Sequence, residues 1–162
     1  MKQIVLENAI GIFATIDDDD YELVNKFKWI LRIKGKKSYA VTGGKSVRLH
    51  RLLLNNPDKS LLVDHINGNG LDNRRENLRV CNNAQNLRNR GKNNNNKGRY
   101  KGVSLRTGKN TYIARIMTDE GKYKYLGDFL TDHDAALAYN KAAIQYHGEF
   151  AYLNIIVDPA GV

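Results

Sequence analysis

The sequence predicts an α+β protein built from two small modules. Three observations support this fold class: strand-like alternation of apolar and polar residues in the N-terminal third, capping signals around two later helices, and a polar run at 91–98 between the modules. We expect a β-rich segment and a strand–loop–strand–helix unit, followed by a three-stranded antiparallel sheet packed on one helix. A chain of 162 residues is long enough for two such modules.

The first elements are predicted to be strands. Residues 2–20 are typical of a short hairpin, because apolar residues stand on both sides of Asn8 and Gly11. The acidic run 17–20 lacks the spaced ligands of a calcium loop, so we interpret it as a solvated turn or helix start. Residues 26–33 alternate with a period of two, which predicts a strand with one buried face. That face would carry Phe27, Trp29, Leu31 and Ile33.

A second hairpin and a short helix are expected next. Residues 38–42 and 45–49 flank Gly43-Gly44, a two-residue hairpin signal. Residues 50–54 then form a short helix that ends before Pro57. Four further elements follow in the order strand, loop, strand and helix: 61–63, 67–70, 78–81 and 83–89.

The helix at 83–89 carries a capping-box pattern, with Asn82 as N-cap and Gln85 three residues later. This helix can bring Asn86 back over the strand that ends at Asp64. The polar run 91–98 is the natural linker. The modules would therefore cover residues 1–90 and 99–157.

The C-terminal module is predicted to contain three short strands and one long helix. The strands are expected at 102–105, 111–117 and 122–127. The helix is expected at 132–147, with Thr131 as N-cap, Asp134 at the third position and Gly148 just past its end.

The net positive charge of the chain indicates a nucleic-acid partner. The net charge is +9 and the sequence pI is about 9.6, which is typical of nucleic-acid binders. Between Arg74 and Lys101 there are nine basic residues and one acid, Glu76, so this stretch carries +8. A concentrated stripe of this kind can follow a phosphate backbone, whereas scattered lysines mostly aid solubility.

Other classes are excluded by composition. Cys81 is the single cysteine, so neither a disulfide framework nor a four-thiolate zinc site can form within one chain. No apolar run approaches 18 residues, and acidic residues interrupt the N-terminal segment, so we expect neither a membrane span nor a signal peptide. The expected location is the cytoplasm.

The most informative pattern is Asp64-His65 followed by Asn77 and Asn86. Eleven residues separate His65 from Asn77, and eight separate Asn77 from Asn86. The set offers an imidazole as general base, a carboxylate for a hard cation and two amides, which suits metal-assisted phosphodiester hydrolysis. Oxygen ligands favour Mg²⁺, with Mn²⁺ as the alternative, over softer metals.

These residues stand in segments that resemble HNH endonucleases of the phage and intron homing type, which carry the ββα-metal (His-Me finger) site. The matching segments are 49–51, 63–69, 72–79 and 85–86. The remainder resembles the APETALA-type, ethylene-response-factor-like DNA-binding domain. Its matching segments are 100–103, 112–116, 125–129, 135–143 and 153–154. This second resemblance is incomplete, because Tyr112 and Tyr125 stand where tryptophans are usual.

The first resemblance implies a role for each site residue. His65 would take a proton from the attacking water, and Asp64 and Asn86 would hold one divalent cation. Asn77 would orient the His65 ring through a hydrogen bond. We interpret Asn73 as a loop-stabilising residue and His50 as a packing or positioning residue.

Both resemblances imply a double-stranded DNA partner, bound by a monomer or a transient dimer. We expect cationic side chains from both modules to contact it: Arg74, Arg75, Arg79, Arg99, Lys101, Arg106, Arg115 and Lys124. The predicted function is a site-preferring endonuclease of a phage or mobile element that nicks or cuts both strands. The alternatives are a non-catalytic DNA-binding regulator with a vestigial nuclease fold, and an RNA-directed nuclease or RNA-binding module.

Overall fold

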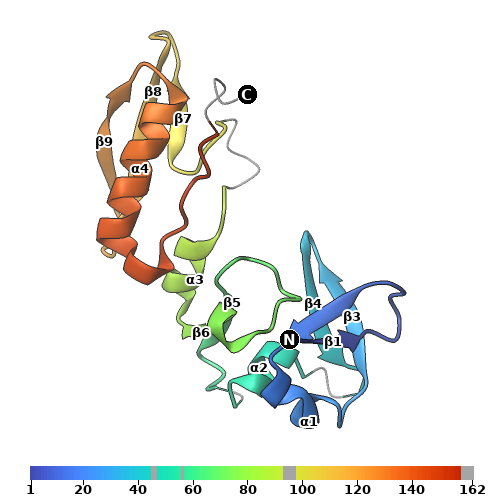
Figure 1. Cartoon of the computed structure of the whole chain (residues 1–162). Coiled ribbons are helices and arrows are strands. Elements are labelled where there is room, and N and C mark those ends of the chain that lie inside the picture. Colours follow the sequence, from blue (N-terminus) through green and yellow to red (C-terminus); the bar gives the residue numbers. More distant parts are fainter. Residues whose placement is uncertain (45–46, 56, 93–97, 158–162) are drawn as a thin grey trace. The chain divides into compact units, whose positions relative to one another are not determined.

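The computed structural model describes residues 1–44, 47–55, 57–92 and 98–157. Contacts divide the chain into two compact units, Met1–Asn86 and Leu87–Val162, and the division falls within helix α3 (Asn83–Asn89). Figure 1 shows the elements of each unit. The mixture of small antiparallel sheets and helices agrees with the predicted α+β class. The linker expected at 91–98 stays a prediction, because 93–97 lie outside the described residues.

Antiparallel strand pairs dominate the described part of unit 1. The pairs are β1 (Lys2–Val5) with β2 (Phe13–Ile16), β3 (Trp29–Lys34) with β4 (Lys37–Thr42), and β5 (Leu62–His65) with β6 (Leu78–Cys81). The short helices between them are η1 (Asp18–Asp20), α1 (Tyr21–Val24), α2 (Leu49–Leu53) and η2 (Arg75–Asn77). The N-terminal hairpin and the helix start in the acidic run are thus confirmed.

The core of unit 1 forms around Trp29, whose indole nitrogen donates to the Val24 carbonyl at 2.9 Å. Leu49 and Leu53 of α2 pack into the same cluster. The buried face expected over 26–33 is only half correct, since Phe27 is 43% exposed and Ile33 is 65% exposed. Phe27 precedes β3, and Ile33 lies near the turn of the β3–β4 hairpin, so neither belongs to the cluster around Trp29.

The hairpin expected around Gly43-Gly44 is wrong in its second strand. The ladder partner of β4 is β3, and residues 45–46 lie outside the described residues. Arg48 makes only an isolated bridge to Val41, and α2 already begins at Leu49. The spacing of Leu49 and Leu53 explains the helix, because residues four apart share the helix face that enters the core.

The predicted strand–loop–strand–helix order is confirmed. In the β5–β6 ladder, Asp64 pairs with Arg79 and His65 pairs with Leu78. The capping box before α3 is also present. The Asn82 amide donates to Gln85 Oε1 at 2.8 Å, and the Gln85 amide donates to Asn82 Oδ1 at 2.9 Å.

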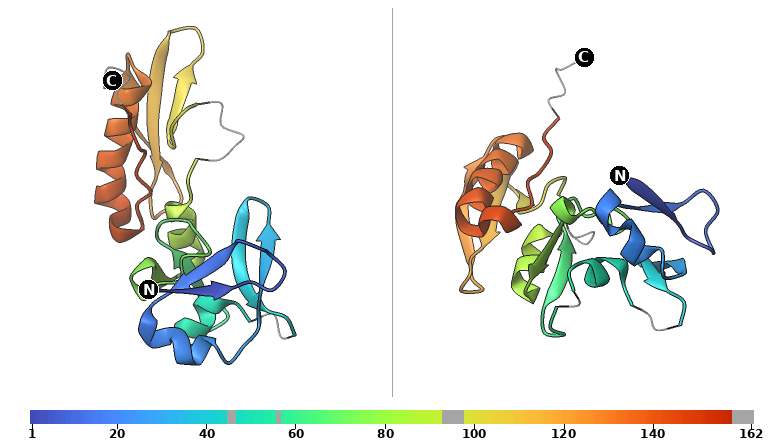
Figure 2. Two further views of the ribbon diagram at one scale, coloured as in Figure 1. Left: turned by 45° about the vertical axis from the view of Figure 1, so that its right-hand side comes forward. Right: turned by 60° about the horizontal axis from the view of Figure 1, so that its bottom comes forward.

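Unit 2 is a three-stranded antiparallel sheet with one helix packed on it (Figure 2). Its elements are β7 (Val103–Arg106), β8 (Thr111–Met117), β9 (Tyr123–Phe129), α4 (Asp132–His147) and η3 (Gly148–Phe150). The predicted caps are confirmed: Thr131 Oγ1 accepts from the Asp134 amide, and Gly148 has φ of 53°. Small residues such as Ala114 and Ala135 are fully buried between sheet and helix. No helix among the described residues is long and apolar enough to cross a membrane.

Candidate active site

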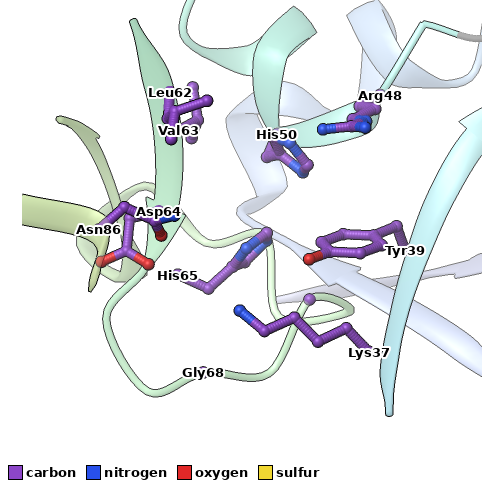
Figure 3. Close-up of a pocket in the computed structure, with 11 residues that line it drawn as sticks. Lys37, Tyr39, Arg48, His50, Leu62, Val63, Asp64, His65, Gly68 and Asn86 are labelled. Atoms are coloured by element: carbon purple, nitrogen blue, oxygen red, sulfur yellow. The ribbon is translucent and has the colours of Figure 1, made fainter. Parts of the chain in front are cut away.

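A pocket of about 100 Å³ in unit 1 holds three of the four predicted site residues. Strand β5 supplies Asp64 and His65 at its end, and α3 supplies Asn86 (Figure 3). The short strand brings the two adjacent side chains into the pocket, and the capped helix returns Asn86 to the same place. The structure therefore brings together the residues predicted to bind a cation and to accept a proton.

Asp64 is a buried carboxylate, 6% exposed, that forms an ion pair with Arg79 across the ladder. Arg79 Nη2 lies 3.0 Å from Asp64 Oδ2, and Nε lies 3.3 Å from the same oxygen. The guanidinium is itself only 9% exposed. A buried carboxylate requires a partner, and Arg79 provides it. The expected contact of Arg79 with DNA stays a prediction.

His65 is 5% exposed, and burial lowers the pKa of its imidazole below the ordinary value of 6.5. A hydrogen bond with Asn73 and the nearby Asp64 charge oppose this shift without cancelling it. Its Nε2 lies 3.3 Å from Asn73 Oδ1. The ring is consequently neutral near pH 7, which is the form able to accept a proton.

Asn77 does not make the predicted hydrogen bond with His65. Its side chain instead fastens the preceding loop: Oδ1 accepts from the Asn67 amide at 2.9 Å, and Nδ2 donates to the Asp72 carbonyl at 2.7 Å. Asn73, which was interpreted as a loop residue, faces the ring in its place. Both asparagines lie in one loop, and only its closed shape determines which of them reaches His65.

The N-terminal hairpin holds this loop in position. The Thr15 amide donates to the Leu71 carbonyl at 2.8 Å, and the Asn73 amide donates to the Thr15 carbonyl at 2.7 Å. Strand β2 therefore fixes the backbone of Asn73 directly. The hairpin, which carries none of the predicted site residues, is a structural support of the pocket.

Two further arginines of the predicted basic stripe are paired within unit 1. Arg75 holds the buried carboxylate of Asp20, with Nη2 at 2.6 Å from Oδ1, and its amide donates to Asp17. Arg74 pairs with Asp72 at 2.8 Å and also with Glu76. These pairs raise the pKa values of both guanidinium groups. Acids of the same unit therefore pair with both guanidinium groups, and their contact with DNA stays a prediction.

A histidine outside the predicted set lies against His65. The ring centroids of His50 and His65 are 4.9 Å apart at an angle of 86°, and the Tyr39 ring lies 5.7 Å from His50. His50 is 3% exposed, and burial lowers its pKa to about 3. The packing or positioning role expected for His50 is compatible with this placement. No spacing in the sequence indicates that Tyr39 belongs to the site.

The acid sensitivity of unit 1 should depend on His50. Its pKa is about 3 in the folded state against 6.5 for the ordinary side chain, so the unfolded chain binds more protons between these values. Stability present above pH 6.5 is therefore lost as pH falls through this window, by up to about 1.4 kcal/mol per pH unit. Urea denaturation at pH 6.5, 5.5 and 5.0 gives the free energy of unfolding at each pH. This free energy should fall less steeply with falling pH in His50→Gln than in the wild type. Parallel slopes would contradict this account.

The cations expected to bind DNA in unit 2 have different surroundings. Arg106 pairs with Asp128, and Lys124 contacts the Tyr146 hydroxyl on the helix side of the sheet. Lys101 donates to the carbonyls of Arg88 and Arg90, and burial lowers its pKa to about 8. Two cations remain exposed: Arg99 lies over the Tyr100 ring, and Arg115 stands on β8 without an acidic partner among the described residues. The DNA contacts expected of these residues stay predictions.

The donor set fits a hard divalent cation. Asp64 and Asn86 offer carboxylate and amide oxygens in one pocket. Throughout the described ranges, no group of three or more His, Cys, Asp or Glu could hold a metal. Mg²⁺ typically takes one or two protein oxygens and completes its shell with water and substrate phosphate, which matches this sparse set. A zinc-type cage of histidines and thiolates does not match it.

Comparisons with known proteins agree with the geometry. A family model described as HNH endonuclease matches residues 56–88, which include β5, β6 and most of α3. The chain is 33% identical over 159 residues to "Uncharacterized HNH endonuclease L560" of Acanthamoeba polyphaga mimivirus. That alignment covers 94% of this chain and 80% of the viral protein. No solved structure gives a significant match. With this similarity over nearly its whole length, the chain belongs to the HNH endonucleases and is a nuclease.

Proposed function

We propose that this nuclease hydrolyses phosphodiester bonds of double-stranded DNA, with His65 as the general base and Asp64 and Asn86 as ligands of one divalent cation. The observation that supports it best is the juxtaposition in one pocket of a neutral, buried imidazole with two oxygen donors. General-base catalysis and cation binding require these groups together. The net charge of +9 supports a polyanionic substrate.

The surroundings of His65 favour a defined tautomer. A proton on Nε2 can be donated to Asn73 Oδ1, 3.3 Å away, which leaves the lone pair on Nδ1. Nδ1 then takes a proton from water as the water attacks phosphorus. The family implies that the bond to the 3′ oxygen breaks, which leaves 5′-phosphate and 3′-hydroxyl ends. When bound, Mg²⁺ or Mn²⁺ would neutralise charge on the phosphate and on the leaving oxygen.

Arg79 and Asn77 act on the site indirectly under this proposal. Arg79 donates from Nε and from Nη2 to Asp64 Oδ2, which holds the carboxylate in one orientation. Asn77 keeps the loop between β5 and β6 closed through Asn67 and Asp72. We therefore assign Asn77 to positioning of the loop and not to contact with the base.

Plasmid nicking tests this function. Wild-type protein should convert supercoiled plasmid to the open circular form in Mg²⁺ or Mn²⁺, and EDTA should abolish the conversion. A labelled duplex should be preferred over a structured RNA of equal length in competition. Absence of nicking with either cation, combined with intact DNA binding, would support the non-catalytic regulator instead.

Site preference is proposed to come from unit 2. Its sheet presents Arg115 on an exposed position of β8, where an arginine can read guanine in the major groove. Arg115→Ala should weaken binding to a selected site by about 1–3 kcal/mol and leave nonspecific nicking largely intact. A shift in Kd measured by fluorescence anisotropy on selected and scrambled duplexes checks this. Equal Kd values for the variant and the wild type on the selected site would show that the sheet face with Arg115 does not recognise the site.

A further inference from the structure

We infer that Lys37 and Arg48 form a cationic wall of the active-site pocket that binds the scissile phosphate, with Lys37 as a further catalytic residue. This inference rests on the proposed function and extends it to residues outside the HNH segment. Both side chains line the pocket that contains Asp64, His65 and Asn86. In the view of Figure 3, Asp64 and Asn86 lie on one side of His65, and Lys37 and Arg48 lie on the other.

The wall is held rigidly against the catalytic loop. Lys37 begins β4, and Arg48 is tied to the same strand by its bridge to Val41. The loop approaches β4 so closely at Gly70 that an added Cβ would stand 2.2 Å from the Ser38 carbonyl oxygen. Only glycine permits this approach without a shift of the backbone. Backbone packing therefore sets the distance between the loop and the start of β4, which carries Lys37.

The segment that contains Lys37 and Arg48 is rich in basic residues. From Leu23 to Pro57 the sequence contains nine basic residues and no acid. Lys28 of this segment pairs with Glu7, which lies outside it. Lys37 and Arg48 have no acidic partner within the described ranges, in contrast to Arg74, Arg75 and Arg79.

Two unneutralised cations beside a neutral imidazole select an anion with several oxygens. A phosphodiester that enters the pocket between the two sides would place its non-bridging oxygens toward Lys37 and Arg48. Negative charge on these oxygens grows as water attacks, so a preplaced ammonium stabilises the transition state more than the ground state. Lys37 transfers no proton in this scheme, because His65 accepts the proton from water.

The test compares Lys37→Gln with Lys37→Arg and with the matched control Lys34→Gln. Lys34 is the ladder partner of Lys37 on the same hairpin and does not line the pocket. Single-turnover nicking at saturating duplex should slow by about 10²-fold in Lys37→Gln, as for loss of one oxyanion donor. Lys37→Arg should recover at least a tenth of the wild-type rate, and Lys34→Gln should match the wild type. Equal rates for Lys37→Gln and Lys34→Gln would overturn the inference.

Failure of the proposed function is distinguishable from failure of this inference. If the wild type nicks and Lys37→Gln nicks equally fast, the wall is wrong and the function stands. If the wild type does not nick, the wall is tested by binding alone. The double variant Lys37→Gln/Arg48→Gln lacks both cations. The slope of the logarithm of its DNA association constant against the logarithm of the salt concentration should be smaller in magnitude by about 1.8, at 0.9 per phosphate contact. An unchanged slope would refute the wall.

Discussion

Replacement of His65 by alanine is expected to lower the single-turnover nicking rate by about 10²–10⁴-fold, because the variant has no group to accept the proton of the attacking water. Burial lowers the pKa of the wild-type imidazole below 6.5, which favours the neutral, proton-accepting form near pH 7. Duplex binding in EDTA should change little, since the ring carries no charge that could contact phosphate.

His65→Gln and His133→Ala complete this experiment. His65→Gln keeps a polar side chain in the pocket, and it should be as inactive as His65→Ala if proton transfer is the role of the ring. His133 pairs with Asp132 on α4 and does not line the pocket, so its removal should leave nicking unaffected. Nicking by His65→Gln at the wild-type rate would assign His65 a structural role only.

Arg79→Met is expected to have the largest effect on stability. The substitution leaves the Asp64 carboxylate buried without its partner, which typically costs about 3–5 kcal/mol of unfolding free energy. Arg79→Met/Asp64→Asn should recover part of the loss, because the amide carries no charge to desolvate. Urea denaturation of unit 1, followed by Trp29 fluorescence, measures both effects.

The matched control for Arg79 is Lys28→Met. Lys28 pairs with Glu7 in the same unit, but its side chain is 85% exposed, so the loss should stay within about 1 kcal/mol. Saturating Mn²⁺ should stabilise Arg79→Met more than the wild type, because the bound cation supplies the missing positive charge. Equal stability losses for Arg79→Met and Lys28→Met would show that the buried pair does not hold the site together.

Elements with local signals were predictable from the sequence. The β5–β6–α3 order, the Asn82–Gln85 capping box and the Thr131 cap all depend on residues within one or two turns of each other. The same holds for the position of Asp64 and His65 at the end of a strand. Sequence reasoning succeeds here because local preferences and the tertiary fold agree.

Partners distant in the sequence were not predictable. Arg75 meets Asp20 across 55 positions, and Arg79 meets Asp64 across 15. With Arg74 and Arg88, four of the nine basic residues of the stripe pair with an acid. Lys37 and Arg48 lie in the acid-free segment 23–57 and have no acidic partner in the described ranges. Asn73 replaces Asn77 at His65 because Thr15 fixes the loop backbone. The local pattern of apolar and polar residues does not indicate any of these pairings.

The central claim is that Asp64 and Asn86 share one divalent cation beside the His65 ring. The most direct test is NMR of the ring protons of the four histidines during titration with Mn²⁺ in the presence of a non-cleavable duplex. The account predicts strong paramagnetic broadening of the His65 resonances at substoichiometric Mn²⁺, and its loss in both Asp64→Asn and Asn86→Ala. The account would be contradicted if the His65 resonances of the wild type stay sharp. It would also be contradicted if they broaden as strongly in Asp64→Asn and Asn86→Ala as in the wild type.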